Sequence, residues 1–226
     1  MLPVLPVLPK LPVLGERSKD GEKERSKMMR LEQARKLGME VVEEMAPGCD
    51  RVVMGGSVRR GVAVVKDVEI VYLARMEECQ ADMFRVDQVP ATERLIARLV
   101  DREFWQFDEQ VRRNGPKYKR MIKMTRDGQR MVVELFRAEI ENWGLVLALR
   151  TGPGDFNRLL VDRMRGAMPV EMVMRDGWLW RRGELVKTVT EEGFFEEIGV
   201  PCWPPHQRTA VRLARFLFER RMAEGR

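Results

Sequence analysis

The chain has 226 residues, 44% of them hydrophobic, and a formal net charge of +6. This composition indicates a soluble globular protein with one sizeable domain or two small ones. No apolar run approaches the ~20 residues that span a membrane, and no signal peptide is evident, so we expect a cytoplasmic protein without a membrane partner. The three cysteines are widely spaced, which argues against a disulfide framework and a cysteine zinc site.

A proline-rich stretch occupies residues 2–15, with a proline at about every third position. Proline removes amide donors and favours extended polyproline II over helix or central strand. A charged link follows over residues 16–27. We expect residues 1–27 to form a flexible arm that docks either on its own domain or on a partner protein.

A helix is predicted over residues 28–45, and a short buried strand follows at residues 51–54. The helix places on one face the apolar residues Leu31, Ala34, Leu37, Val41 and Met45. The strand ends at Gly55 and Gly56, where the missing Cβ lets the backbone turn sharply and approach a ligand. Ser57 adds a hydroxyl at the same turn.

Two acids follow in the next predicted strand, residues 66–72. Asp67 and Glu69 stand two residues apart, so their side chains point to the same face of the strand. Two neighbouring carboxylates repel each other unless a cation lies between them, and oxygen ligands suit Mg2+. The alternative is a hairpin with a solvated acidic face.

An amphipathic helix is predicted over residues 90–100, and two strands over residues 118–124 and 129–137. The strands form a hairpin, because Asp127-Gly128 is a strong turn signal. Glu134 interrupts an apolar run in the second strand, and an ionised side chain rarely tolerates such a position without a partner or a metal. The alternative is an outward-facing glutamate on an edge strand.

Basic residues are concentrated between positions 112 and 130, where Asp127 is the only acid. Such a density attracts phosphates, and a solvated basic hairpin is the alternative. The candidates for nucleic-acid contact are Arg112, Arg113, Lys117, Lys119, Arg120, Lys123 and, further along the chain, Arg158.

The last third of the chain begins with a predicted buried strand over residues 143–150 and a helix over residues 155–168. Asp176-Gly177 predicts a second hairpin, and a short acidic helix starts at Glu191. A final amphipathic helix over residues 209–223 is expected to pack through one side, which carries Val211, Ala214, Phe218 and Met222.

Several motifs, taken in order, resemble the nucleotidyltransferase superfamily and, within it, the X-family DNA polymerases related to DNA polymerase beta. They are residues 56–61, the acids at 67 and 69, the strand around Glu134, the turn 151–157 and the segment 191–208. The resemblance covers about residues 28–208. It implies an α+β fold with a nucleotidyltransferase palm, a mixed sheet with helices on one face, over residues 28–150, and a small α+β thumb over residues 151–226.

The resemblance also implies roles for individual residues. Asp67, Glu69 and Glu134 would hold two Mg2+ ions, with Mn2+ as an alternative. Gly56, Ser57 and Arg60 would grip the phosphates of a nucleoside triphosphate, and Arg59 would either share that task or form a salt bridge within the palm. The turn that lies against the incoming nucleotide is matched by Thr151, Gly152, Phe156 and Asn157. Pro153, Leu149 and Arg150 depart from the family pattern, which weakens any expectation about the sugar.

The function that this resemblance implies is DNA-directed addition of nucleotides to a primer 3′-hydroxyl, with release of pyrophosphate. Primer-template or gapped DNA would be the partner, as in DNA repair. One alternative is a template-independent nucleotidyltransferase acting on RNA, protein or a small molecule. The other is a catalytically silent nucleic-acid-binding protein.

Overall fold

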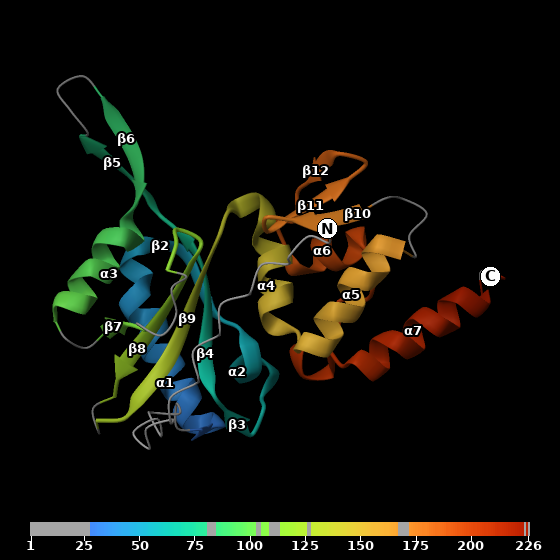
Figure 1. The fold of residues 1–226 in the computed structure, drawn as a ribbon, viewed down its shortest axis with the longest axis horizontal. Helices are drawn as coiled ribbons and strands as arrows, with labels where there is room; N and C mark the ends of the chain where they lie inside the picture. Colours follow the sequence, from blue (N-terminus) through green and yellow to red (C-terminus); the bar gives the residue numbers. More distant parts are fainter. Residues whose placement is uncertain are drawn as a thin grey trace, which may run out of the picture.

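The fold is described from a computed structural model, which covers residues 28–80, 85–102, 105–108, 114–125, 128–166, 172–223 and 225 (Figure 1). The expected arm, residues 1–27, lies outside the described residues, as do Arg112 and Arg113. The chain is α+β, with helices and strands around a mixed central sheet. Within the described ranges, no helix combines the length and the apolar character needed to cross a membrane.

Five strands form the central sheet, and only one neighbouring pair is parallel. In spatial order they are β2 (Cys49–Met54), β4 (Asp67–Ala74), β9 (Arg130–Ala138), β8 (Tyr118–Met124) and β7 (Trp105–Phe107). β4 and β9 run parallel, and the other pairs are antiparallel. The predicted strand at 118–124 is confirmed, and the strand predicted at 129–137 is displaced by one residue.

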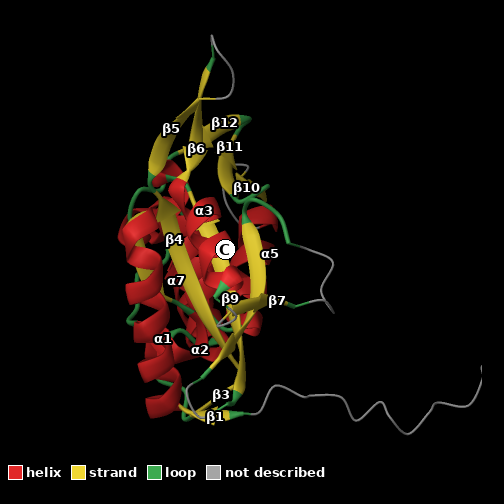
Figure 2. Ribbon diagram, turned by 90° about the vertical axis from the view of Figure 1, so that its left-hand side faces the viewer, coloured by secondary structure: helices red, strands yellow, loops and turns green. Residues whose placement is uncertain are grey.

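One face of this sheet is covered by α1 (Leu31–Met45) and α3 (Ala91–Asp101), and Figure 2 shows α1 lying lengthwise beside β4. Alternate strand residues point to this face, among them Ile70 of β4 and Leu135 of β9. The buried residues of α1 are Ala34, Leu37, Gly38, Val41 and Met45, which confirms its predicted apolar face. The side chains between these strand positions therefore point to the opposite face of the sheet.

Shorter elements complete the part of the chain that carries this first core. They are β1 (Met29–Arg30), paired with β3 (Val64–Val65), the 3-10 helix η2 (Ala46–Gly48), helix α2 (Gly56–Arg60), and the hairpin of β5 (Met76–Gln80) and β6 (Val86–Pro90). The β5–β6 hairpin projects from the body of the molecule in Figure 1.

A second core is built from the rest of the chain, on the right of Figure 1. Its elements are η3 (Ile140–Asn142), α4 (Trp143–Thr151), α5 (Gly154–Gly166), β10 (Met172–Arg175), β11 (Trp178–Arg181), β12 (Glu184–Val186), α6 (Glu191–Glu197), η4 (Pro205–Gln207) and α7 (Ala210–Ala223). β10, β11 and β12 form an antiparallel sheet. The turn predicted at Asp176-Gly177 is confirmed, with φ of 56° and 82°, as a tight two-residue hairpin loop requires.

The strand predicted at residues 143–150 is wrong, because this segment is helix α4. Trp143 and Leu147 pack against the central sheet, whereas Leu145 and Ala148 lie in the second core. A helix that is enclosed on several sides carries apolar residues nearly all round, so it shows no helical period.

The expected packing side of the last helix is also wrong. Val211, Ala214, Phe218 and Met222 are all exposed on α7. The helix instead packs through Leu213, which is fully buried, and through Phe216 and Leu217. Both sets of residues have helical spacing, so the pattern alone could not distinguish the buried side from the exposed one.

Candidate active site

Three carboxyl side chains share the face of the central sheet that α1 and α3 leave uncovered. In the parallel pair β4 and β9, Glu69 is the register partner of Glu134, and Asp67 is the partner of Val132. Register partners point to the same face, and Asp67 lies two residues from Glu69 on the same strand. Strand geometry therefore brings Asp67, Glu69 and Glu134 to one face near the start of β4.

The environment of these acids disfavours their charged forms. Burial, with the nearby charges of Asp67 and Glu134, raises the pKa of Glu69 to about 7. Burial and the charge of Glu134 likewise raise the pKa of Asp67. Among the described residues, none donates a hydrogen bond to the carboxylate of Asp67 or Glu69. Two half-buried carboxyl groups thus stand side by side without a hydrogen-bond donor from the described part of the chain.

Glu134 has partners from the neighbouring strand β8. Its Oε1 accepts hydrogen bonds from Tyr118 Oη at 2.9 Å and from Arg120 Nη1 at 2.7 Å. Arg120 Nε also donates to Asp108 Oδ2 at 2.8 Å. Burial alone would lower the pKa of Arg120, but these hydrogen bonds outweigh it and raise the pKa. In the described part of the chain, no group of three or more acidic, histidine or cysteine side chains is close enough to hold a metal ion as it stands.

The glycine turn lies directly against Glu69. Gly55 N donates to Glu69 O at 2.8 Å, and Gly56 begins α2 with φ of 59°. A Cβ at Gly56 would lie 2.8 Å from Glu69 Oε2, so only glycine permits this approach. Ser57 follows half-buried, and no described residue is bonded to its hydroxyl.

Two arginines leave α2 in different directions. Arg60 lies near the acids, since its charge lowers the pKa of both Glu69 and Asp67, and its Nη1 donates to Thr151 O at 2.7 Å. Arg59 is engaged by Glu191 of α6 through two hydrogen bonds of 2.8 Å. Of the two alternatives for Arg59, the structure therefore has the salt bridge, although its partner comes from the second core.

Glu191 is itself the centre of a buried ionic cluster. Its carboxylate is 6% exposed and also accepts a hydrogen bond of 2.6 Å from Arg208, whose side chain is 1% exposed. Burial alone would raise the pKa of Glu191, but the hydrogen bonds and charges of Arg59 and Arg208 lower it. Sequence reasoning missed this cluster, because nothing local signals a contact between residues so far apart in the chain.

The turn expected to contact a nucleotide is instead the joint between the two cores. Thr151 and Phe156 are fully buried, and Thr151 Oγ1 accepts a hydrogen bond from Arg59. Asn157 Nδ2 donates to Leu149 O at 2.6 Å and to Gly152 O at 3.0 Å. In this structure these residues hold the turn, and Thr151, Gly152 and Phe156 are buried. Their contact with a nucleotide stays a prediction.

Three described cations of the expected basic surface are held in internal ion pairs. Lys119 lies 3.1 Å from Glu93 of α3, and Lys123 lies 2.6 Å from Glu44 of α1. Both lysines are buried on the face that packs on these helices, and Arg120 is bound to Asp108 and Glu134. Only Lys117 and Arg158, of the described candidates, remain exposed. The prediction of a phosphate-binding surface is therefore contradicted for the buried Lys119 and Lys123. For Arg112 and Arg113, which lie outside the described residues, it stays a prediction.

The sequence held a usable signal for the pairing of Arg120 with Glu134, which was not predicted. A hairpin centred on Asp127 places Arg120 opposite Glu134, as the observed register does. Comparison with known proteins adds no further assignment, because neither a family model nor a curated protein matches the chain.

Proposed function

We propose that the protein is a nucleotidyltransferase that uses Asp67, Glu69 and Glu134 to bind divalent metal. The observation that carries the proposal is the shared sheet face of the three acids, with the pKa of Glu69 raised to about 7 by burial and by its acidic neighbours. Ionisable groups with strongly perturbed pKa values gather at functional sites. The proposal that the first core is a nucleotidyltransferase palm rests on the same residues and on the resemblance of the sequence motifs.

The donor set fits Mg2+ or Mn2+. It consists of carboxylate oxygens, and two of the three groups have no hydrogen-bond donor in the described chain. Metal ions bound there would supply positive charge and Lewis acidity to a phosphoryl group. Glu134 would join the set only when its carboxylate turns from Arg120 and Tyr118 toward Glu69, since these donors now occupy its Oε1.

The remaining residues of the site suit a triphosphate. Gly56 brings its backbone close to the Glu69 carboxylate, Ser57 offers an unoccupied hydroxyl among the described residues, and Arg60 adds a positive charge beside the acids. The primer hydroxyl would be held near Asp67 for in-line attack on the α-phosphate, with pyrophosphate leaving toward Arg60.

The preference for a DNA primer and template rests mainly on the resemblance, because Lys119, Arg120 and Lys123 of the basic hairpin are held in internal ion pairs. A template-independent transferase therefore stays the principal alternative. A silent binding protein is less favoured, since such a protein gains nothing from three acids that repel one another.

Primer extension tests the proposal. A labelled primer, alone and annealed to a template, is incubated with Mg2+ or Mn2+ and each of the four dNTPs and NTPs. We expect metal-dependent extension that Glu69→Gln abolishes and that Glu78→Gln, an exposed acid of the β5–β6 hairpin, leaves unchanged. Extension only with the template-directed base supports the polymerase assignment, and equal extension of the free primer supports the template-independent one. No transfer to any acceptor with any nucleotide contradicts the proposal.

A further inference from the structure

The three-stranded sheet of the second core has one buried and one exposed face. Met172 and Leu179 point into the core. The opposite face carries the register pairs Val173 with Trp180 and Arg175 with Trp178, and Leu185 is paired with Trp180 from the third strand. Val173 is 40% exposed and Leu185 is 42% exposed. Aromatic, aliphatic and basic side chains thus alternate over one open surface.

A hollow of about 220 Å3 lies on this surface, lined by Val173, Arg175, Trp180, Arg182 and Gly183. The Arg175 guanidinium lies 5.0 Å from the centroid of the Trp180 ring, within cation–π distance. The hollow is smaller than the ~300–1,000 Å3 of pockets that enclose a drug-sized ligand. Its size and its flat indole wall suit a single planar ring that is attached to something larger.

The hollow is positively charged, and its two arginine side chains are available to a ligand. Arg182 is exposed at the β11–β12 turn, with φ of 51°, and no described residue pairs with it. Arg175 lies 3.9 Å from Asp176, but both side chains are well exposed, so this pair is weak. No acidic residue is among the described residues that line the hollow.

We propose that this exposed face, formed by Val173, Arg175, Trp178, Trp180 and Arg182, is a binding platform for single-stranded nucleic acid. A base stacks in the hollow against Trp180 and the Arg175 guanidinium, and the flanking phosphates pair with Arg175 and Arg182. Aromatic rings next to arginines are the general means by which proteins hold unpaired strands without reading their sequence.

The platform adjoins the sheet that carries the acids. The turn between β10 and β11 accepts two hydrogen bonds. Lys117 Nζ donates to Asp176 O at 3.3 Å, and Asn142 Nδ2 donates to Gly177 O at 3.0 Å. Lys117 directly precedes β8, the strand of Arg120. Under the proposed function, an unpaired segment held on the platform would belong to the nucleic acid on which the candidate site acts. Only this link to the candidate site rests on the proposed function, because binding of nucleic acid to the platform does not require nucleotidyl transfer.

Fluorescence anisotropy of a labelled oligothymidylate tests the platform, with the full chain in buffer that lacks divalent ions. Trp180→Leu should weaken binding about 5- to 150-fold, the range for loss of one stacked base, and Trp180→Phe should retain most of the affinity. Arg175→Ala combined with Arg182→Ala should reduce the slope of log affinity against log salt by about 1.4, as expected for two lost phosphate contacts on a single strand.

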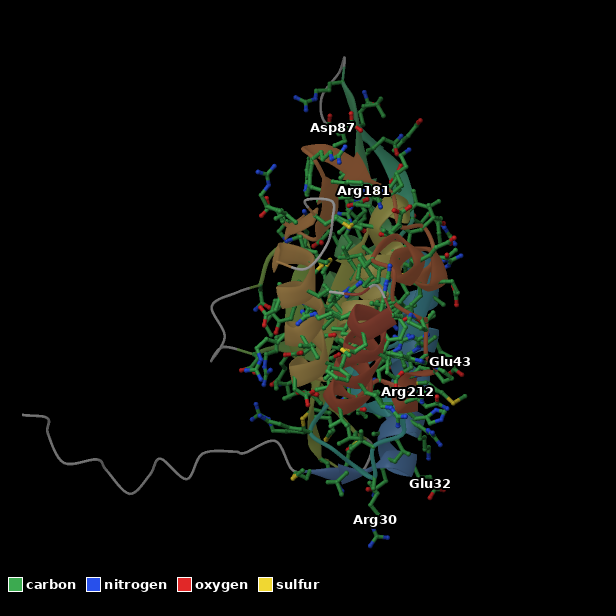
Figure 3. All side chains as sticks on the ribbon, turned by 90° about the vertical axis from the view of Figure 1, so that its right-hand side faces the viewer. Arg30, Glu32, Glu43, Asp87, Arg181 and Arg212 are labelled. Atoms are coloured by element: carbon green, nitrogen blue, oxygen red, sulfur yellow. The ribbon has the colours of Figure 1, made fainter. Side chains whose placement is uncertain are left out.

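Arg212→Ala combined with Arg221→Ala is the matched control, because it removes the same charge from α7. Arg212 lies 5.1 Å from the centroid of Trp203, so the control also breaks a cation–π pair. Figure 3 shows Arg212 well away from Arg181, the residue before Arg182. Melting curves establish that each variant is folded.

Three results would overturn the platform. They are equal loss of affinity in the two double-arginine variants, unchanged affinity in folded Trp180→Leu, and tighter binding of blunt duplex or of a polyglutamate peptide than of the oligothymidylate. Because no metal or nucleotide is present, the platform and the transferase activity can each fail without the other.

Discussion

At the scale of single residues, Glu69 links the chemistry of the candidate site to the stability of the fold. Its pKa is raised to about 7 in the folded chain by burial, Asp67 and Glu134, whereas an unfolded glutamate titrates near 4.5. Between these values the folded state binds more protons than the unfolded state. Stability contributed by protonated Glu69 is therefore present at low pH and lost as pH rises toward and through 7.

Glu69→Gln should remove this contribution. Without divalent ions, we compare the free energy of unfolding of the wild type with that of the variant at each pH. The difference, wild type minus variant, should fall by on the order of 3 kcal/mol from pH 4 to pH 8. Urea unfolding at several pH values measures the difference, and Glu78→Gln serves as the exposed control. Parallel pH profiles for the wild type and Glu69→Gln would show that Glu69 is not perturbed.

Residue types and strand alternation were enough to predict that Asp67 and Glu69 share a face. They were not enough to predict the partners of the basic residues on β8. Lys119 and Lys123 looked like part of a solvated basic hairpin. They are neutralised by Glu93 and Glu44, which come from helices far away in the chain. Partners of this kind depend on how helices pack on the sheet, which a local pattern does not encode.

At the scale of elements, α4 and α6 depend on one glycine. A Cβ on Gly144 would lie 1.8 Å from Thr190 O, a backbone atom that cannot move like a side-chain end. Gly144→Ala should therefore separate α4 from the chain before α6 and destabilise the fold by about 3 kcal/mol or more. Gly154→Ala, where an added Cβ meets nothing within 4 Å, should leave stability equal or slightly higher.

Thermal and urea unfolding of these two variants give the comparison. Equal stability of Gly144→Ala and Gly154→Ala would mean that α4 and the segment before α6 are not in contact as described.

The ionic cluster around Glu191 gives a second prediction for these elements. Glu191→Ala leaves Arg208, 1% exposed, without its carboxylate partner. Leaving one member of a buried ion pair alone costs about 3–5 kcal/mol. Urea unfolding should show this loss for Glu191→Ala and a change within about 1 kcal/mol for Glu192→Ala, the exposed neighbour on α6. Equal effects would remove the cluster from the account of stability.

The elements that the sequence predicted well are those with one apolar side and a clear end signal. α1 has such a side, and the β10–β11 hairpin has Asp176-Gly177. α4 was taken for a strand because it packs on both cores and so lacks a period. The buried side of α7 was misassigned because two sets of apolar residues compete on one helix.

At the scale of the whole molecule, two hydrophobic cores meet beside the candidate site. α4 packs on both, and Arg59 joins α2 of the first core to Glu191 of the second. Arg60 spans the same joint, because it lies near Glu69 and donates to Thr151 O. The position of Arg60 beside the acids therefore depends on how the two cores are held together.

The central claim is that Asp67, Glu69 and Glu134 together bind a divalent metal. Isothermal titration of the full chain with Mn2+ at pH 6, 7 and 8 tests it most directly, alongside Asp67→Asn, Glu134→Gln and the control Glu78→Gln. We expect saturable binding by the wild type and the control, and affinity that rises as pH passes 7, because Glu69 must lose its proton to bind metal. Both site variants should bind at least about tenfold more weakly. Asp67→Asn should melt no lower than the wild type, whereas Glu134→Gln also loses the ion pair with Arg120. Binding that is absent in the wild type, or unchanged in both site variants, would contradict the claim.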